Sequence, residues 1–300
     1  MFRHAALAAV CAAVVACSPA STDSAGPPSP LAADTASPAA SGSAEPSPSP
    51  TPTGPTPPSD VSPFTDPNEL AEALATAETT LASPETSDEA VRAWAWLQQQ
   101  AYRDLVVNLD WRPTAKAALP PEFHTAFDLN IHAGTQLRKL TKPREALPDW
   151  RIIPAPPVDE LRAHYDAAAA EFGVDWSYLA AIHFVESRMG RIRGTSTAGA
   201  RGPMQFMPAT WEAYGEGDID DPRDAIRAAA RYLVAHGAPG NMRRALYAYN
   251  HSQLYVDAIE DHARVMREYP HYYRTYYNWR VYYITVNGDI LLEEGYGVPS

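Results

Sequence analysis

The chain has 300 residues, of which 45% are hydrophobic, so it is long enough for a buried core in one or two domains besides its tails. Its formal net charge of -12 and sequence pI near 5.2 argue against a nucleic-acid partner, because phosphate binding needs clustered Lys and Arg. Its two cysteines, Cys11 and Cys17, stand too close to the N-terminus to form a disulfide within a folded core, and its nine scattered histidines lack metal-ligand spacing, so we expect no metal and no cofactor.

The first segment, residues 1–16, has a basic start at Arg3 followed by a short apolar run. This run is too short to span a bilayer, so it predicts an export signal rather than a permanent anchor. The sequence Val-Val-Ala-Cys that ends at Cys17 is similar to the lipobox of bacterial lipoproteins. That similarity implies cleavage before Cys17, a diacylglycerol on its sulfur, and anchoring at the outer face of the cytoplasmic membrane in the cell envelope. The alternative is an ordinary secretory signal that leaves a free protein.

Residues 17–66 form a segment rich in Pro, Ser, Thr and Ala with almost no large apolar side chain. Such a segment cannot bury enough surface to offset the entropy of ordering. It predicts a disordered tether between the lipidated cysteine and the folded part.

A helical subdomain and a proline-rich strap are predicted over residues 67–157. Apolar residues recur at helical spacing from Leu70 to Leu81, and Thr86 to Glu89 have the pattern of a capping box that opens a second helix. A third periodic stretch runs from Phe123 to Leu140. The prolines of residues 147–157 then predict an extended strap or linker.

The next unit, residues 158–300, contains a helix with an acid on its apolar face. Asp175 is a suitable N-cap, and Gly190 offers a stop, which predicts a helix over residues 176–189. Four positions at helical spacing form its apolar stripe: Leu179, Ile182, Glu186 and Met189. A carboxylate is costly to desolvate there, so we expect Glu186 either to have a function or to turn to the edge of the stripe and pair with an arginine such as Arg188.

A glycine-rich loop at residues 194–204 follows this helix and permits close approach of the backbone to a ligand. Further short helices are predicted from Pro208, from Asp221 as N-cap and from Asn241 as N-cap. Near the end, Asn287-Gly288 stands between two strand-like runs and predicts a β-hairpin. The predicted fold is therefore mainly α, with a short C-terminal hairpin.

Three motifs in this unit resemble the signatures of the soluble lytic transglycosylase family. They are Glu186-Ser187, the segment 196–211 (STAGARGPMQFMPATW) and Ala-Tyr-Asn at 248–250. The extended second motif is similar to that of actinobacterial lipoprotein members of the family. The resemblance implies a lysozyme-like catalytic domain that cleaves the glycan strands of peptidoglycan.

The family resemblance implies Glu186 as the only catalytic acid. It also implies five substrate-binding residues: Ser196, Met204, Gln205, Tyr249 and Asn250. Ser196 would be a hydrogen-bond partner of the acid, and Tyr249 would place its hydroxyl close to it. In the alternative for Gln205, its amide hydrogen-bonds only to the backbone of the loop rather than to substrate. In the alternative for Tyr249, it is a core aromatic residue. His183, one turn before the acid, is expected to be packed or on the helix surface.

The implied reaction uses one carboxyl group to cut the β-1,4 bond between N-acetylmuramic acid and N-acetylglucosamine with formation of a 1,6-anhydro end. The pKa of Glu186 must then lie near neutral, as burial would make it. One alternative is a hydrolytic muramidase with a second carboxylate, for which there are four candidates: Asp218, Asp220, Asp221 and Asp224. Asp221 is better explained as a helix cap and the other three as solvated loop charge. Another alternative is a peptidoglycan-binding scaffold with little turnover that docks proteins of cell-wall synthesis or division through residues 67–150.

Overall fold

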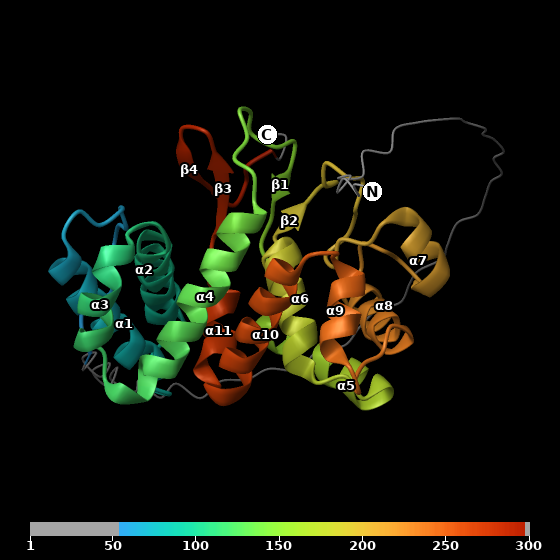
Figure 1. Ribbon diagram of the computed structural model, residues 1–300, viewed down its shortest axis with the longest axis horizontal. Coiled ribbons are helices and arrows are strands. Elements are labelled where there is room, and N and C mark those ends of the chain that lie inside the picture. The colour runs from blue at the N-terminus through green and yellow to red at the C-terminus, as the bar shows by residue number, and fades with distance from the viewer. Residues whose placement is uncertain (1–53, 298–300) are drawn as a thin grey trace, which may run out of the picture. The chain divides into compact units, whose positions relative to one another are not determined.

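The computed structural model describes residues 54–297, which contain eleven α-helices and two small antiparallel sheets (Figure 1). This confirms the predicted mainly helical fold. The predicted export signal, Cys17 and most of the predicted tether lie outside the described residues.

The first two helices are α1 (Pro67–Ala82) and α2 (Asp88–Val107), which pack against each other. Asp66 caps α1 by accepting hydrogen bonds from two backbone N–H groups of its first turn. The predicted capping box of α2 is wrong by one residue. Ser87, not Thr86, is the N-cap and accepts from the Ala90 N–H at 3.3 Å, while the Thr86 hydroxyl donates to the Thr80 carbonyl.

The next helices are α3 (Arg112–Ala118) and α4 (His124–Leu140), with the 3₁₀ turns η1 (Leu109–Trp111) and η2 (Pro121–Phe123) before them. The periodic stretch predicted over residues 123–140 is confirmed as α4. The sequence analysis missed α3, whose seven residues are too few for a clear apolar period.

The proline-rich segment is extended and is held by backbone hydrogen bonds. Its strand β1 (Arg151–Ile152) pairs with β2 (Ile192–Arg193) just after the Glu186 helix. On its other side, Ile152 exchanges backbone hydrogen bonds with the C-terminal tail at Gly295 and Tyr296. The strap therefore joins the end of the chain to the loop that follows this helix.

The remaining helices before the hairpin are α5 (Val158–Phe172), α6 (Trp176–Ser187), α7 (Pro208–Tyr214), α8 (Pro222–Ala235), α9 (Met242–Tyr249), α10 (Gln253–Glu268) and α11 (His271–Tyr277). The predicted caps are confirmed at α6, α8 and α9, where Asp175, Asp221 and Asn241 each accept a hydrogen bond from a backbone N–H group of the first turn. Helix α10 packs against both α4 and α6, so it connects the two halves of the described chain (Figure 1).

One continuous hydrophobic core includes residues from both sides of position 158. Buried polar pairs cross the same boundary: Tyr272 donates to Glu78 and Tyr276 donates to Asn130. Burial raises the pKa of Glu78, whose Oε1 also accepts from a second tyrosine hydroxyl on α2. The division into a subdomain at 67–157 and a domain at 158–300 stays a prediction.

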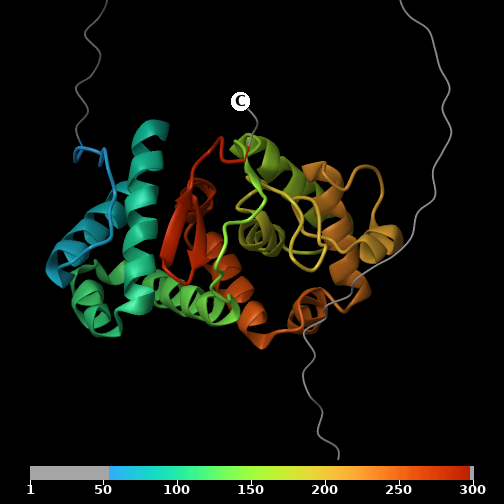
Figure 2. The same cartoon turned by 90° about the horizontal axis from the view of Figure 1, so that it is seen from above.

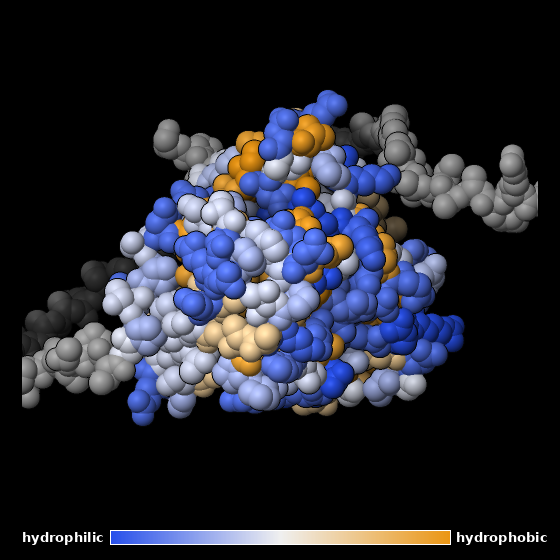
Figure 3. Space-filling model, turned by 60° about the vertical axis from the view of Figure 1, so that its left-hand side comes forward, coloured by the Kyte–Doolittle hydropathy of each residue, from blue (hydrophilic) through white to orange (hydrophobic). Residues whose placement is uncertain are grey.

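The predicted hairpin is confirmed as β3 (Val281–Thr285) paired with β4 (Gly288–Leu292). The two-residue turn is Val286-Asn287, so Gly288 opens the second strand with a φ of 118°. Seen from above, the hairpin lies between α2 and the segment that follows α4 (Figure 2). The face in Figure 3 is mostly hydrophilic, with hydrophobic residues gathered near its top. In the hairpin and its turn, Ile290 and Val286 are exposed apolar residues.

Candidate active site

A cavity of about 560 Å³ lies between α2 and α4 on one side and α6 with the first turns of α10 on the other. The hairpin residues Tyr282 and Tyr283 and the segment from Leu140 to Trp150 also line it. Nearly half of its lining residues therefore precede Val158. Of the predicted site residues, Glu186, Ser196 and Asn250 line this cavity.

Glu186 lies in the last turn of α6 and points into this cavity from a helix whose other stripe residues are fully buried. Its side chain is only partly accessible to solvent. Its Oε1 accepts a hydrogen bond of 2.7 Å from the Tyr255 hydroxyl. Burial raises the pKa of Glu186 to about 7, and the hydrogen bond from Tyr255 opposes this rise by favouring the charged form. At neutral pH the group can therefore both give and take a proton.

The alternative in which Glu186 pairs with Arg188 is wrong. Glu186 makes no ion pair with any arginine of residues 54–297. The Arg188 guanidinium instead lies 4.3 Å from the centroid of the Phe184 ring. Arg188 and Met189 both have left-handed backbone conformations, with φ of 55° and 60°, so the helix ends earlier than the predicted stop at Gly190.

Tyr255 is the contact of Glu186 that the sequence analysis missed. It stands in the first turn of α10, is 1% exposed and is close-packed beside Tyr249, with parallel rings 6.4 Å apart. Burial, followed by the nearby charge of Glu186, raises the pKa of Tyr255 well above its ordinary range. Tyr255 thus stays protonated and acts as a donor. No sequence signal marked it, because it lies outside the three motifs and resembles any buried tyrosine of an amphipathic helix.

Burial, followed by the charge of Glu186, raises the pKa of Tyr249 well above its ordinary range. Its hydroxyl, however, donates to the Met204 carbonyl at 2.7 Å and not to the acid. Met204 is fully buried, and its side chain is core rather than part of the cavity lining. The bond between Tyr249 and Met204 therefore ties the glycine-rich loop to the end of α9.

The side chains of Ser196 and Gln205 both form hydrogen bonds with the backbone of the glycine-rich loop. The Ser196 Oγ accepts from the Ala200 N–H at 2.9 Å, and no hydrogen bond joins it to Glu186. The Gln205 amide donates to the Gly202 carbonyl at 2.9 Å, and its backbone has a φ of 50°. In this geometry Gln205 provides a hydrogen-bond donor for a backbone carbonyl of the loop, which was the alternative to substrate binding.

Two buried histidines, His183 on α6 and His262 on α10, do not contact the acid. The His183 ring, fully buried, shares a hydrogen bond of 2.7 Å with the Tyr165 hydroxyl, and burial lowers its pKa to about 3. This confirms the expected packed role. His262 lines the cavity at an edge-to-face contact with Phe184, and burial lowers its pKa to about 3 as well. Both side chains are neutral at physiological pH.

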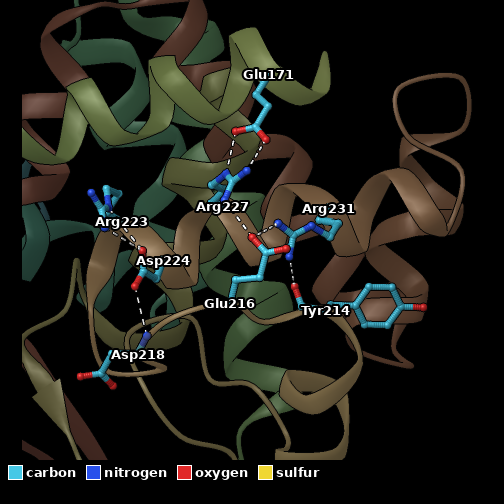
Figure 4. Close-up of polar contacts among 8 residues, drawn as sticks. All are labelled: Glu171, Tyr214, Glu216, Asp218, Arg223, Asp224, Arg227 and Arg231. Atoms are coloured by element: carbon cyan, nitrogen blue, oxygen red, sulfur yellow. Dashed lines mark hydrogen bonds and ion pairs between the residues drawn. The ribbon is translucent and has the colours of Figure 1, made fainter.

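The aspartates considered as a second carboxylate do not line the cavity with Glu186. Asp221 caps α8, and Asp224 accepts from the backbone N–H of Asp218 and pairs with Arg223 (Figure 4). Asp220 is exposed and lies 3.6 Å from Arg201. These roles agree with the predicted helix cap and loop charges.

An ion-pair network next to these aspartates holds the segment between α7 and α8. Arg227 contacts Glu171 of α5 and Glu216, while Arg231 contacts Glu216 and donates to the Tyr214 carbonyl (Figure 4). Its carboxylates are therefore structural.

The sequence matches known proteins in this half of the chain. Residues 164–264 match the family described as transglycosylase SLT domain. Over 106 residues the chain is 34% identical to the membrane-bound lytic murein transglycosylase F of Thiobacillus denitrificans, which is 33% of this chain and 22% of that protein. Over 71 residues it is 37% identical to the protein of the same name from Pseudomonas fluorescens, which is 24% of this chain and 14% of the relative.

The chain thus spans about a fifth or less of the length of these curated relatives. No solved structure matches it significantly. Within residues 54–297, no helix has the length and apolar character needed to cross a membrane. In the same residues, no group of three or more His, Cys, Asp or Glu side chains is arranged to hold a metal ion.

Proposed function

We propose that the protein is a peptidoglycan lytic transglycosylase, on the premise that residues 164–264 belong to the transglycosylase SLT family. Domains of this family are lysozyme-like, in agreement with the mainly helical fold. The observation that carries the proposal is Glu186, a carboxyl group with a pKa of about 7 in a cavity between helices. A general acid that also serves as a base needs a pKa near the working pH.

The proposed reaction uses Glu186 twice. Its protonated carboxyl gives a proton to the oxygen that bridges N-acetylmuramic acid and N-acetylglucosamine, and the bond from this oxygen to the anomeric carbon breaks. The resulting carboxylate then takes the proton from the C6 hydroxyl of the same N-acetylmuramic acid, whose oxygen bonds to the anomeric carbon. The product is a 1,6-anhydro end, and Glu186 is protonated again. The Tyr255 hydroxyl stabilises the carboxylate between the two steps.

A hydrolytic muramidase is the closest rival, because it would use the same acid with water as the nucleophile. Glycosidases of that type use a second carboxyl group. Among the described residues that line the cavity, the other carboxyl group is Asp289, which is ion-paired with Arg103 and Arg138. This arrangement favours the intramolecular reaction. A binding scaffold has no need for a carboxyl group with a raised pKa, which argues against that alternative.

Mass spectrometry of muropeptides released from purified peptidoglycan tests the proposal. We expect fragments that end in 1,6-anhydro-N-acetylmuramic acid, one water lighter than the hydrolysed species. Reducing ends alone would identify a hydrolase, and binding without cleavage would identify a scaffold. Glu186→Gln should abolish release of fragments while keeping the wild-type circular dichroism spectrum, and substantial turnover by this variant would contradict the assignment of the acid.

For the substrate-binding residues, the proposed roles follow from their positions. Asn250 lines the cavity at the end of α9 and is proposed to bind a sugar. Ser196 lines it from the glycine-rich loop. Gln205, Tyr249 and Met204 are proposed to act from beside the cavity, with Gln205 turning to substrate when its bond to the Gly202 carbonyl opens.

We also propose a location in the cell envelope, which the names of the membrane-bound relatives support. The finer proposal is that residues 1–16 are an export signal and that Cys17 carries the lipid anchor at the outer face of the cytoplasmic membrane. Cys17→Ala should then move the protein from the membrane fraction to the soluble fraction. Retention of this variant in membranes would contradict the anchor.

A further inference from the structure

The cavity that holds Glu186 is rich in cations, although the whole chain has a net charge of -12. Five basic side chains line it: Arg103, Arg138, Lys142, Arg144 and Arg188. Asp289 neutralises part of this charge by ion pairs with Arg103 and Arg138. The other carboxyl group of the lining is Glu186, whose pKa of about 7 leaves it substantially protonated at neutral pH.

Three cations of this cavity have no carboxylate within ion-pair distance among residues 54–297. They are Lys142, Arg144 and Arg188, which we call the basic wall. Arg188 is the most buried of the three, and it stands two residues after Glu186 at the end of α6. A cation withdrawn from water is unfavourable unless an anion pairs with it. The Arg188 guanidinium lies against the Phe184 ring and has no carboxylate partner among residues 54–297, so it is available to pair with an anionic group of a ligand.

Backbone hydrogen bonds fix the position of Arg144. Its N–H donates to the Ile284 carbonyl at 3.1 Å, and its carbonyl accepts from the Val286 N–H at 3.0 Å, so the segment 141–144 runs beside the hairpin. The Arg144 guanidinium lies 3.5 Å from the Thr197 hydroxyl, on the glycine-rich loop across the cavity. Lys142, two residues earlier, is exposed at the same edge. Arg144 of the basic wall is thus held at the edge of the cavity in which the substrate would lie.

We propose that the basic wall binds carboxylates of the peptide stem carried by N-acetylmuramic acid, so that the preferred substrate is glycan with anionic stems. This inference rests on the proposed function. N-acetylglucosamine is neutral, and in a stem-bearing strand the lactyl group is an amide, so the anionic groups of the substrate are those of the stem. Guanidinium groups suit this role because they bind carboxylates with two parallel hydrogen bonds. Lys142 and Arg144 precede residues 164–264, so the segment before the matched domain supplies two of the three residues of the basic wall.

The test compares three preparations of glycan strands with the full chain as enzyme. The first has free stem carboxylates, the second has the same carboxylates converted to neutral amides, and the third has the stems removed, which leaves the lactyl carboxylate. We expect kcat/KM to be about five- to tenfold higher on the first than on the second, mainly through KM, with the difference shrinking at high salt. The double variant Lys142→Gln, Arg144→Gln should lose most of this difference, as both side chains are exposed and the fold does not depend on them.

Lys139→Gln is the matched control, because Lys139 is exposed on α4 but lines a different cavity, and it should keep the wild-type preference. Arg188→Gln should reduce the preference for free stem carboxylates. Arg188→Lys keeps the positive charge and should therefore retain part of this preference. Equal cleavage of the free and amidated strands by the wild type would overturn the inference. An unchanged preference in the double variant would also overturn it. So would a salt-dependent gain in kcat/KM seen only on the strands without stems, because the lactyl carboxylate would then be the anion that is bound.

Failure of the proposed function gives a different result. No anhydro product would then form from any of the three preparations. In that case, the affinity of Glu186→Gln for stem fragments with free carboxylates can be compared with its affinity for fragments with amidated carboxylates. This comparison needs no turnover and still tests the basic wall. A preference for the free carboxylates supports the inference, and equal binding overturns it.

Discussion

Glu186 combines an ordinary helical position with surroundings that favour its neutral form. Burial raises its pKa from 4.5 to about 7, so the folded protein keeps a proton that the unfolded chain releases between these two pH values. The free energy of unfolding therefore falls as the pH rises through this window. One pKa unit corresponds to about 1.4 kcal/mol, so above pH 7 the full loss is about 3 kcal/mol.

Glu186→Gln removes this titration and keeps a similar shape. We expect the variant to be more stable than the wild type by up to about 3 kcal/mol near pH 8.5, with the difference shrinking toward pH 4.5, as measured by urea denaturation at several pH values. Glu212→Gln, at an exposed position of α7, is the control and should show no such pH-dependent gain. A difference independent of pH would contradict the raised pKa.

The Tyr255 hydroxyl opposes the rise in the pKa of Glu186 by stabilising its charged form. Tyr255→Phe removes that hydrogen bond and should raise the pKa further. In the proposed reaction Glu186 must be protonated to act as an acid, so activity should fall as the pH rises through its pKa. We therefore expect the alkaline limb of kcat/KM against pH to move to higher pH in Tyr255→Phe.

Tyr249→Phe is the matched control for this shift. The Tyr249 hydroxyl donates to the Met204 carbonyl and not to Glu186. Its loss should leave the alkaline limb at the wild-type pH, whatever it does to the rate. If both variants moved the alkaline limb equally, the hydrogen bond from Tyr255 would not be what lowers the pKa of Glu186.

At the scale of elements, the glycine-rich loop depends on one close approach. A Cβ at Gly202 would clash with the Ile219 carbonyl oxygen, and the φ of Gly202 is 75°. At Gly199, φ is 93° and no atom lies within 4 Å of the same position. Gly199→Ala should therefore lower the free energy of unfolding by about 1–2 kcal/mol, through left-handed backbone strain alone. Gly202→Ala adds a clash with the backbone and should lower it by about 2–4 kcal/mol.

Urea denaturation and cleavage assays of these two variants measure the contribution of that contact. Gly202→Ala should also reduce activity, since the loop carries Ser196 at the cavity and Gln205 beside it. Equal losses in both variants would show that the contact with Ile219 is unimportant.

The local signals of the sequence predicted most elements correctly, because their causes lie within a few residues. Asp175, Asp221 and Asn241 each cap the helix that follows them. The N-cap of α2 was misplaced by one residue because Thr86 and Ser87 are both favoured at this position, and the structure uses Ser87, the stronger cap of the two. The short α11 was missed because its tyrosines follow no clear apolar period, although two of them are fully buried.

At the scale of the whole molecule, the cavity could be predicted only in part. Glu186 was identified because an acid on an apolar stripe is a local anomaly. Tyr255, Arg103 and Arg144 reach the same cavity from α10, α2 and the segment after α4, and only the tertiary fold brings them together. The same fold turned the Tyr249 hydroxyl to the Met204 carbonyl, which no motif indicated.

Residues 67–157 and 158–300 are expected to fold as one cooperative unit. Helix α10 packs on α4, and the core is continuous across the boundary. A chain of residues 158–300 would expose the α4-facing side of α10 and leave the buried hydroxyls of Tyr272 and Tyr276 without their partners Glu78 and Asn130. We therefore expect this fragment to show no cooperative thermal transition and no cleavage activity.

Residues 54–300 are the control, because they keep every described contact. This fragment should melt at the temperature of the full chain, as measured by circular dichroism. A cooperative transition in residues 158–300 would mean that the family-matched half is a domain of its own, and that the first helices only cover one of its faces. Activity in that fragment would further mean that the cavity walls from α2 and α4 are dispensable for cleavage, leaving them a role in substrate preference.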